Sequence, residues 1–236
     1  MDTSGNLSEK RMHRFHETRY GGDLSLLIMR VLFYWLPTMY TEYIAIYEST
    51  FLKRSYYFTQ ISLTLVTFLS TMAVVISLMK VCSIKVPNKA LKVYQILYPL
   101  TFTSQLIVFV VYWTAIHPKI GDLMKKKSAE HQFFMYIVHI FPFLAAFAEM
   151  IIARPMFIFS EVKNMVIFGL FYTLNNFLQT KFIGGYLPYP FMTWKDSSSL
   201  VAAVVILIIG VIFYYIATKI TDSINGHEEE DKKKVE

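Results

Sequence analysis

Three long stretches without a single Asp, Glu, Lys or Arg constrain this chain more than any other feature. They occupy residues 57–79, 93–116 and 199–218, and the last has the sequence SLVAAVVILIIGVIFYYIAT. A helix needs about 20 mostly apolar residues to cross the hydrocarbon core of a bilayer, and charge-free runs of this length are typical of such helices. The sequence therefore predicts a membrane protein of the all-α class.

Three further apolar runs bring the predicted number of transmembrane helices to about six, with five to seven left open. The composition agrees, since 55% of the 236 residues are hydrophobic and 17% are aromatic. Six spans use nearly the whole chain, which leaves room for one bundle at 23–222 between an N-terminal tail at 1–22 and a charged tail at 223–236. The predicted spans are residues 24–48, 57–79, 93–116, 132–153, 162–183 and 199–221.

The placement of Lys and Arg predicts the orientation. These residues concentrate in the two tails and in the connections after the second and fourth predicted spans, so the positive-inside rule places both termini in the cytosol. Near the end of the chain, Lys233 and Lys234 resemble the dilysine signal that coat proteins bind on proteins of the endoplasmic reticulum membrane. The alternative is a solvated charge run without a targeting role.

Several enzyme classes lack their motifs in this sequence. A single cysteine, Cys82, excludes an intramolecular disulfide and a thiolate metal cluster. The sequence contains no HExxH motif, no Gly-x-Ser-x-Gly elbow and no glycine-rich phosphate loop. We therefore expect no metal, no cofactor and no nucleic-acid partner.

The predicted span 132–153 contains two ionisable residues, His139 and Glu149. Such residues are costly in a bilayer and usually face the bundle interior or a water-filled cavity. His139 lies about 12 Å from the non-cytosolic end of the span, where an imidazole can accept and donate a proton; the alternative is a structural histidine. Glu149 lies about 280° further around the helix, so we expect it to pair near the cytosolic rim, with Arg154 or a basic loop.

Thr59 begins the second predicted span in the same half of the membrane as His139, and Glu42 reaches a similar depth. A hydroxyl beside a base can act as a nucleophile, although threonine in a membrane helix commonly bonds to its own backbone. In the fifth span, Asn175 and Asn176 either line a polar cleft or connect neighbouring helices.

Four segments occur in this order between residues 56 and 192: YFTQISLTLVTFL, YPLTFTSQLIVFVVYWTAIHPK, HIFPFLAAFAEM and GGYLPYPF. Together they resemble the androgen-induced protein family, membrane hydrolases of fatty acid esters of hydroxy fatty acids. That family also includes the androgen-dependent tissue-factor-pathway-inhibitor regulating protein. The resemblance implies a six-helix intramembrane hydrolase in which Thr59 is the nucleophile and His139 its partner.

The placement of the family's threonine has an alternative in this sequence. The family has Tyr-Gly-Gly shortly before its threonine, and anchoring on Tyr20–Gly22 would place Ile28 at that position. We prefer Thr59, because its neighbours Phe58 and Leu63 keep the local pattern of the family.

The sequence thus predicts a threonine-type hydrolase of fatty acid esters of hydroxy fatty acids that takes its lipid substrate laterally from the bilayer. Thr59 and His139 are the catalytic candidates. Asn175, Asn176 or the backbone of Thr59 would bind the oxyanion, and Glu42 is a third supporting candidate. The alternative is a multi-pass protein without enzymatic activity, either a lipid-binding regulator or a small transporter, in which the buried ionisable residues serve structure or proton transfer.

Overall fold

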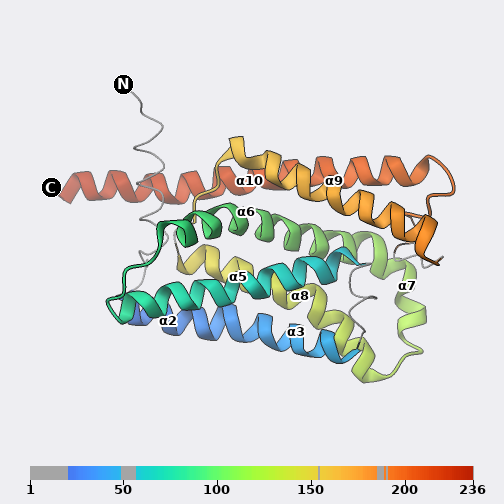
Figure 1. Cartoon of the computed structure of the whole chain (residues 1–236), viewed down its shortest axis with the longest axis horizontal. Helices are drawn as coiled ribbons and strands as arrows, with labels where there is room; N and C mark the ends of the chain where they lie inside the picture. The colour runs from blue at the N-terminus through green and yellow to red at the C-terminus, as the bar shows by residue number, and fades with distance from the viewer. Residues whose placement is uncertain (1–20, 49–56, 154, 185–188, 190, 236) are drawn as a thin grey trace.

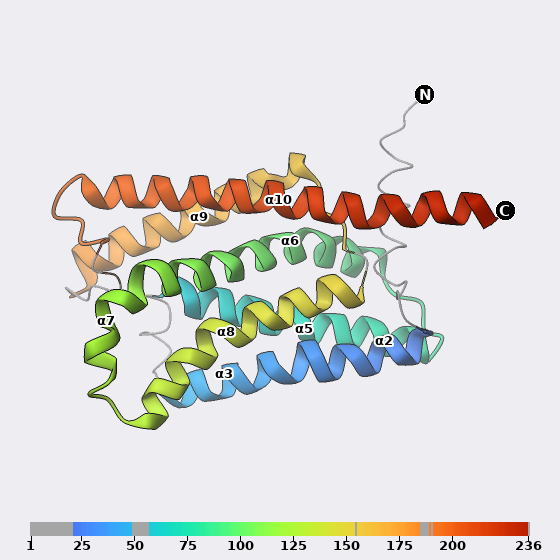
Figure 2. The ribbon, with the colours of Figure 1, turned by 180° about the vertical axis from the view of Figure 1, so that it is seen from behind.

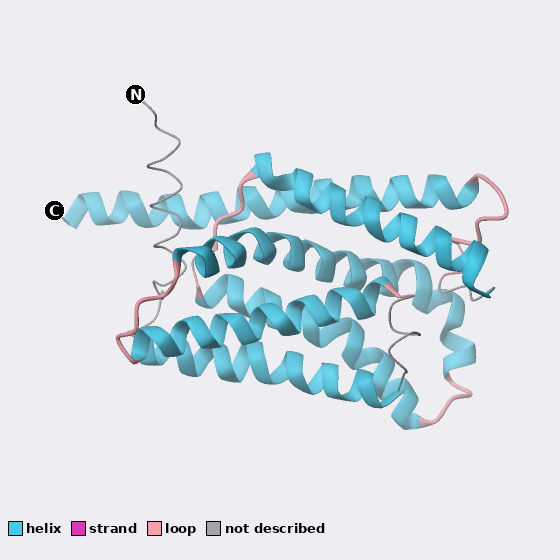
Figure 3. Cartoon of the chain, in the orientation of Figure 1, coloured by secondary structure: helices cyan, strands magenta, loops and turns pink. Residues whose placement is uncertain are grey.

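The computed structural model describes residues 21–48, 57–153, 155–184, 189 and 191–235, with the backbone alone at 48, 184 and 224–235. In this part of the chain all regular elements are helices, joined by loops, and there is no strand (Figure 3). The prediction of an all-α protein is confirmed. The helical segments are α2 (Asp23–Arg30), η1 (Val31–Trp35), α3 (Leu36–Glu48), α5 (Phe58–Val81), α6 (Asn88–Val111), η2 (Tyr112–Ile116), α7 (His117–Met124), α8 (Ala129–Ile152), η3 (Phe159–Glu161), α9 (Val162–Leu178), η4 (Gln179–Gly184) and α10 (Ser198–Val235).

Among the described residues, five continuous helices are long and apolar enough to cross a membrane, which confirms a multi-span bundle. They correspond to five of the six predicted runs. The remaining run, 162–183, is also helical, but α9 has only 17 residues and carries Lys163 and three asparagines, and it is not among these five. The five helices are Asp23–Tyr47, Phe58–Val81, Asn88–Met124, Ala129–Ile152 and Ser198–Ser223.

The helices run lengthwise beside one another, with α6 at the centre (Figures 1 and 2). Helix α6 contacts α5 and α8 on one side and α10 on the other, while α3 packs against α5 and α8. Helix α9 packs along α10, so these two form a pair against α6. The start of α2 and the end of α10 lie at the same end of the bundle (Figure 1).

Small and hydroxyl side chains fill much of the interior between the helices. On α5, Ser70, Ala73 and Ser77 are buried, and the hydroxyls of Ser70 and Thr38 lie 2.7 Å apart. Inside a bilayer no hydrophobic force draws apolar helices together, so close packing of small residues and bonds between helices have to stabilise the bundle. These contacts fix α3 against α5.

Three π-helical segments occur in the described residues. One, η4, follows α9, and the other two interrupt long helices, η1 after α2 and η2 after α6. Such segments occur frequently at functional sites, because the extra residue changes the direction of side chains. Segment η2 begins with Tyr112, which is buried. Helix α7 follows with Pro118 in its first turn, where a missing N–H costs no hydrogen bond. Figure 1 shows α7 turned away from the axis of α6.

Candidate functional site

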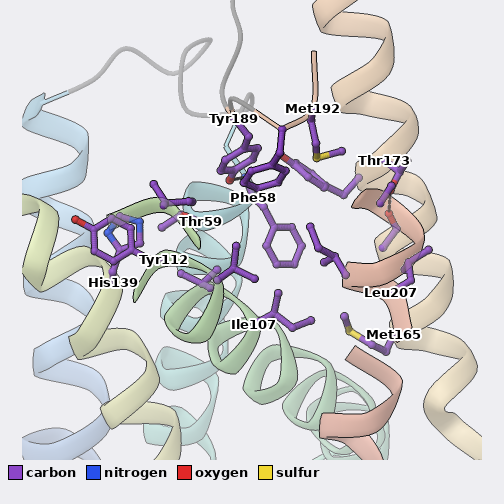
Figure 4. A pocket seen from close by; sticks show the side chains of 18 residues that line it. Phe58, Thr59, Ile107, Tyr112, His139, Met165, Thr173, Tyr189, Met192 and Leu207 are labelled. Carbon is purple, nitrogen blue, oxygen red and sulfur yellow. Dashed lines mark hydrogen bonds between the residues drawn. The ribbon is translucent and has the colours of Figure 1, made fainter. Parts of the chain in front are cut away.

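A cavity lies between α5, α6, η2, α8, α9 and α10, towards the end of the bundle at which α5 begins. Including its mouth, it holds about 650 Å³ of space free of protein atoms. Its walls are mostly aromatic and aliphatic side chains, with few polar groups among them (Figure 4). Thr59 and His139 both line it. The two residues are far apart in the sequence, so only the packing of α5 against α8 brings them to one cavity.

Thr59 is the second residue of α5 and is 8% exposed. The first N–H groups of a helix lack partners within the helix and carry the positive end of its dipole. Here the N–H of Phe58 donates to the hydroxyl oxygen of Tyr189 at 3.0 Å. That hydroxyl also lies within hydrogen-bonding reach of the side chains of Thr59 and Tyr172. Three hydroxyls and a helix N-terminus therefore meet at one end of the cavity.

Tyr189 belongs to the connection between η4 and α10, and its phenol is buried. Burial raises the pKa of the Tyr189 phenol, and the surrounding hydrogen bonds from Tyr172, Thr59 and Phe58 lower it by less than burial raises it. The phenol is therefore neutral at physiological pH and keeps a proton that it can donate. A neutral donor at this position can stabilise negative charge on a neighbouring group.

His139 lies on α8 with 7% of its surface exposed. Its Nδ1 lies 2.6 Å from the carbonyl oxygen of Met135. Because a carbonyl only accepts, Nδ1 carries the proton, and in the neutral ring Nε2 is the acceptor. The imidazole also stacks on the ring of Tyr112, with centroids 3.6 Å apart and an interplanar angle of 11°. These two contacts fix both the tautomer and the orientation of the ring.

Figure 4 shows Thr59 between the His139–Tyr112 pair and Tyr189. A hydroxyl, a base with a fixed tautomer and a phenolic donor thus share the polar end of an otherwise apolar cavity. Electrostatic interactions are stronger in such surroundings than in water, because the local dielectric constant is low. A hydroxyl, an imidazole nitrogen that can accept a proton and a phenolic donor are the kinds of group that nucleophilic catalysis uses.

The other predicted site residues lie outside the lining of this cavity. Asn176 is buried, and its Oδ1 accepts the indole N–H of Trp194 at 2.7 Å. The Oδ1 of Asn175 accepts from the side-chain amide of Gln179 at 2.7 Å, within the same helix. On α3, Glu42 accepts from the hydroxyl of Thr64 at 3.2 Å.

Glu149 forms a buried ion pair with Arg30, in which Nη2 and Oε1 lie 2.6 Å apart and the two side chains are 1% and 0% exposed. The expected partner was Arg154 or a basic loop, and Arg154 lies outside the described residues. The observed partner is 119 positions away in the sequence, and the packing of α2 against α8 brings the two residues together. Arg30 also donates to the hydroxyl of Ser77 at 2.7 Å, and the hydroxyl of Tyr94 donates to Glu149 at 2.6 Å.

Sequence reasoning missed the tyrosines of the site. Tyr112 and Tyr172 occur in apolar runs, where a tyrosine is indistinguishable from any other core aromatic. Tyr189 had a signal, because it begins the Tyr-Pro-Phe ending of the segment GGYLPYPF. An aromatic-rich segment at the end of a span also fits the interfacial belt of a membrane protein, and this interpretation hid its role in the cavity.

No group of three or more His, Cys, Asp and Glu side chains in the described part of the chain has an arrangement that would hold a metal ion. Comparison with protein-family models, with curated proteins and with solved structures finds no match. Fold and site together define a polytopic α-helical membrane protein with a buried cavity that is polar at one end.

Proposed function

We propose that this protein is an intramembrane ester hydrolase in which Thr59 is the nucleophile and His139 is the base. The observation that carries the proposal is that both residues line one apolar cavity. All four segments that resemble the androgen-induced protein family contribute residues to its walls, including Tyr112 and Tyr189. This supports fatty acid esters of hydroxy fatty acids, taken from the bilayer, as the substrate class. Lys233 and Lys234 support the endoplasmic reticulum as the membrane, and the placement of Lys and Arg supports a cytosolic position of both termini.

The proposed reaction begins when His139 Nε2 accepts the proton of the Thr59 hydroxyl. The Thr59 oxygen attacks the ester carbonyl carbon and forms a tetrahedral intermediate. The bond to the alcohol oxygen then breaks, and the leaving alkoxide takes the proton from His139. Water attacks the acyl-threonine with His139 again as the base, which releases the fatty acid and restores the Thr59 hydroxyl. One water is consumed for each ester.

The oxyanion of the intermediate would be bound at the start of α5. The neutral Tyr189 hydroxyl would be the donor, and the N–H of Phe58 in the first turn of that helix, which donates to the Tyr189 oxygen at 3.0 Å, holds it in position. Donors aimed at the developing charge are worth about 3–4 kcal/mol each in other hydrolases. Asn175 and Asn176, the other candidates from the sequence, bond Gln179 and Trp194 instead.

The test is hydrolysis of a branched hydroxy-fatty-acid ester by membranes that contain equal amounts of wild type, Thr59→Ala or His139→Ala. Removing a nucleophile or its base costs about 10³-fold or more in rate. The matched control is Thr173→Val, because Thr173 also lines the cavity but its hydroxyl donates to the carbonyl of Gly169 at 2.8 Å. An active Thr59→Ala or His139→Ala protein would overturn the scheme.

A lipid-binding regulator without catalysis is the second candidate, because the same apolar cavity would suit a bound lipid. A fluorophosphonate probe separates the two candidates. It should form a covalent adduct at Thr59 in the hydrolase, identified by mass spectrometry, and none in the His139→Ala protein. A small transporter with Glu149 as proton relay is less well supported, because Glu149 is held by Arg30 and Tyr94.

A further inference from the structure

The cavity has a second end that the proposed chemistry does not use. Away from His139, it extends between α6, α9 and α10, where Figure 4 shows Ile107, Met165 and Leu207. These side chains carry no N–H or O–H group, and neither do Ala203 and Ile206 beside them on α10. We call this part, lined by Ile107, Met165, Gly169, Ala203, Ile206 and Leu207, the apolar arm.

Glycine at position 169 makes room for a wall of the apolar arm. A Cβ atom added to Gly169 would lie 2.3 Å from Cδ2 of Leu207, so Leu207 occupies the space that a side chain at 169 would need. On α10, a Cβ added to Gly210 would lie 3.1 Å from both Ile107 Cδ1 and Met165 Cε. Small residues of this kind allow membrane helices to approach closely. Leu207 therefore packs against Gly169, and Ile107 and Met165 pack against Gly210, where these side chains form the wall of the arm.

We propose that the apolar arm binds the hydrocarbon chain of a fatty acyl group, with the carboxyl end at Thr59, and that Gly169 and Leu207 set the longest chain it admits. The inference rests on the proposed function for the position of the carboxyl end. An apolar chain gains free energy by leaving water for a matched apolar cavity, and it needs no hydrogen-bonding partner there. The hydrogen-bond donors near Tyr189 and Thr59 bind the carboxyl end of the acyl group.

The proposal predicts opposite effects of two substitutions on the longest chain that binds. In Gly169→Ala the new methyl group displaces Leu207 into the arm, so the longest chains no longer fit. In Leu207→Ala the arm gains space, so longer chains bind. The double variant Gly169→Ala, Leu207→Ala should return close to the wild-type profile, because the added methyl group then meets no leucine. Each methylene that no longer fits lowers the affinity about fourfold.

The experiment measures binding without any need for hydrolysis. Full-length protein in nanodiscs is labelled with a fatty acid that carries a photoreactive group at its methyl end, and saturated fatty acids from octanoate to stearate compete. We expect adducts on α9 and α10 near Met165 and Leu207, and the shifts in chain-length profile described above. The matched control is Gly121→Ala on α7, where an added Cβ meets nothing within 4 Å.

The outcomes for the arm and for the hydrolase are distinguishable. Chain-length profiles of Gly169→Ala and Leu207→Ala that equal the wild type would overturn the inference even if the wild type hydrolyses esters. Adducts confined to surfaces outside the cavity would do the same. Conversely, suppose that the two variants show the expected shifts in chain-length profile while the wild type hydrolyses no ester. That result would support the arm and overturn the proposed function.

Discussion

Two buried polar centres lie in the same bundle, and they differ in how their polar groups are satisfied. The first joins Arg30 and Glu149, which neutralise each other and bond Ser77 and Tyr94 besides. The second joins Thr59 and His139 beside a cavity. The first centre connects four helices, α2, α5, α6 and α8. Its two charges neutralise each other and are buried, so neither is available to bind a ligand. The second places polar groups next to space that a ligand can enter.

This difference shows that the cost of burying a group does not by itself identify a functional site. In the sequence, Glu149 and His139 are equally conspicuous, because both are ionisable residues in one apolar span. The packing of the helices separates them. Glu149 is fully buried and paired, whereas His139 presents one nitrogen to a backbone carbonyl and lines the cavity with its ring.

The largest expected effect is the loss of the buried ion pair. Glu149→Ala should destabilise the protein by about 3–5 kcal/mol, because Arg30 would keep an unpaired charge in the interior. Replacing both partners together, Arg30→Met with Glu149→Leu, should restore most of this stability, since no buried charge is then left. Thermal unfolding in detergent measures both variants.

The exposed pair of Asp122 and Lys125 provides the control for this prediction. Its side chains are 94% and 78% exposed, so Asp122→Asn should leave the unfolding temperature unchanged. A Glu149→Ala protein as stable as this control would show that the Arg30 centre does not stabilise the bundle, and the comparison between the two centres would fail.

The next effect concerns the polar end of the cavity. Tyr189→Phe should lower the rate of ester hydrolysis about 10²-fold, or about 2.7 kcal/mol in the barrier, because the oxyanion loses one donor. The unfolding temperature should fall as well, because the N–H of Phe58 loses its acceptor, although the ring still packs against Tyr57 and Phe191. The rate is measured with matched protein amounts.

Tyr214→Phe is the control for Tyr189→Phe. Its hydroxyl also bonds a neighbouring group, the carbonyl of Ile158 at 3.2 Å, but Tyr214 is not part of the cavity lining. This variant should keep its activity. If both variants lose activity equally, the effect reflects helix packing, and the polar end of the cavity has no special role.

The smallest effect is expected outside the membrane, before α10. The backbone N–H and hydroxyl of Ser198 donate to Asp196 and hold the pKa of that exposed carboxyl below its ordinary value. A carboxyl with a depressed pKa in the folded state adds stability above its unfolded pKa, and the gain is lost as the pH falls through the folded value. Asp196→Ala should therefore lower the unfolding temperature slightly at neutral pH and not at all in acid. Lys195→Ala, at the neighbouring exposed position, should show no such pH dependence.

The sequence alone determined that the chain forms membrane helices, because a run of about 20 apolar residues without charge has one stable conformation in a bilayer. It also marked His139 and Glu149 as buried ionisable residues, and the resemblance of four segments drew attention to Thr59. These are local properties, and they follow from the residues within each helix and their spacing.

Only the tertiary structure decided which of these residues meet. Arg30 and Glu149 are 119 positions apart, and their pairing depends on the rotation of α2 and α8 about their own axes. The hydroxyl of Tyr189 accepts the N–H of Phe58 at the start of α5, which is 131 positions away in the sequence. No local pattern encodes such contacts, since each requires two surfaces to fit at one crossing. The same fit leaves the cavity between α6, α9 and α10, where the glycines at 169 and 210 let the helices approach.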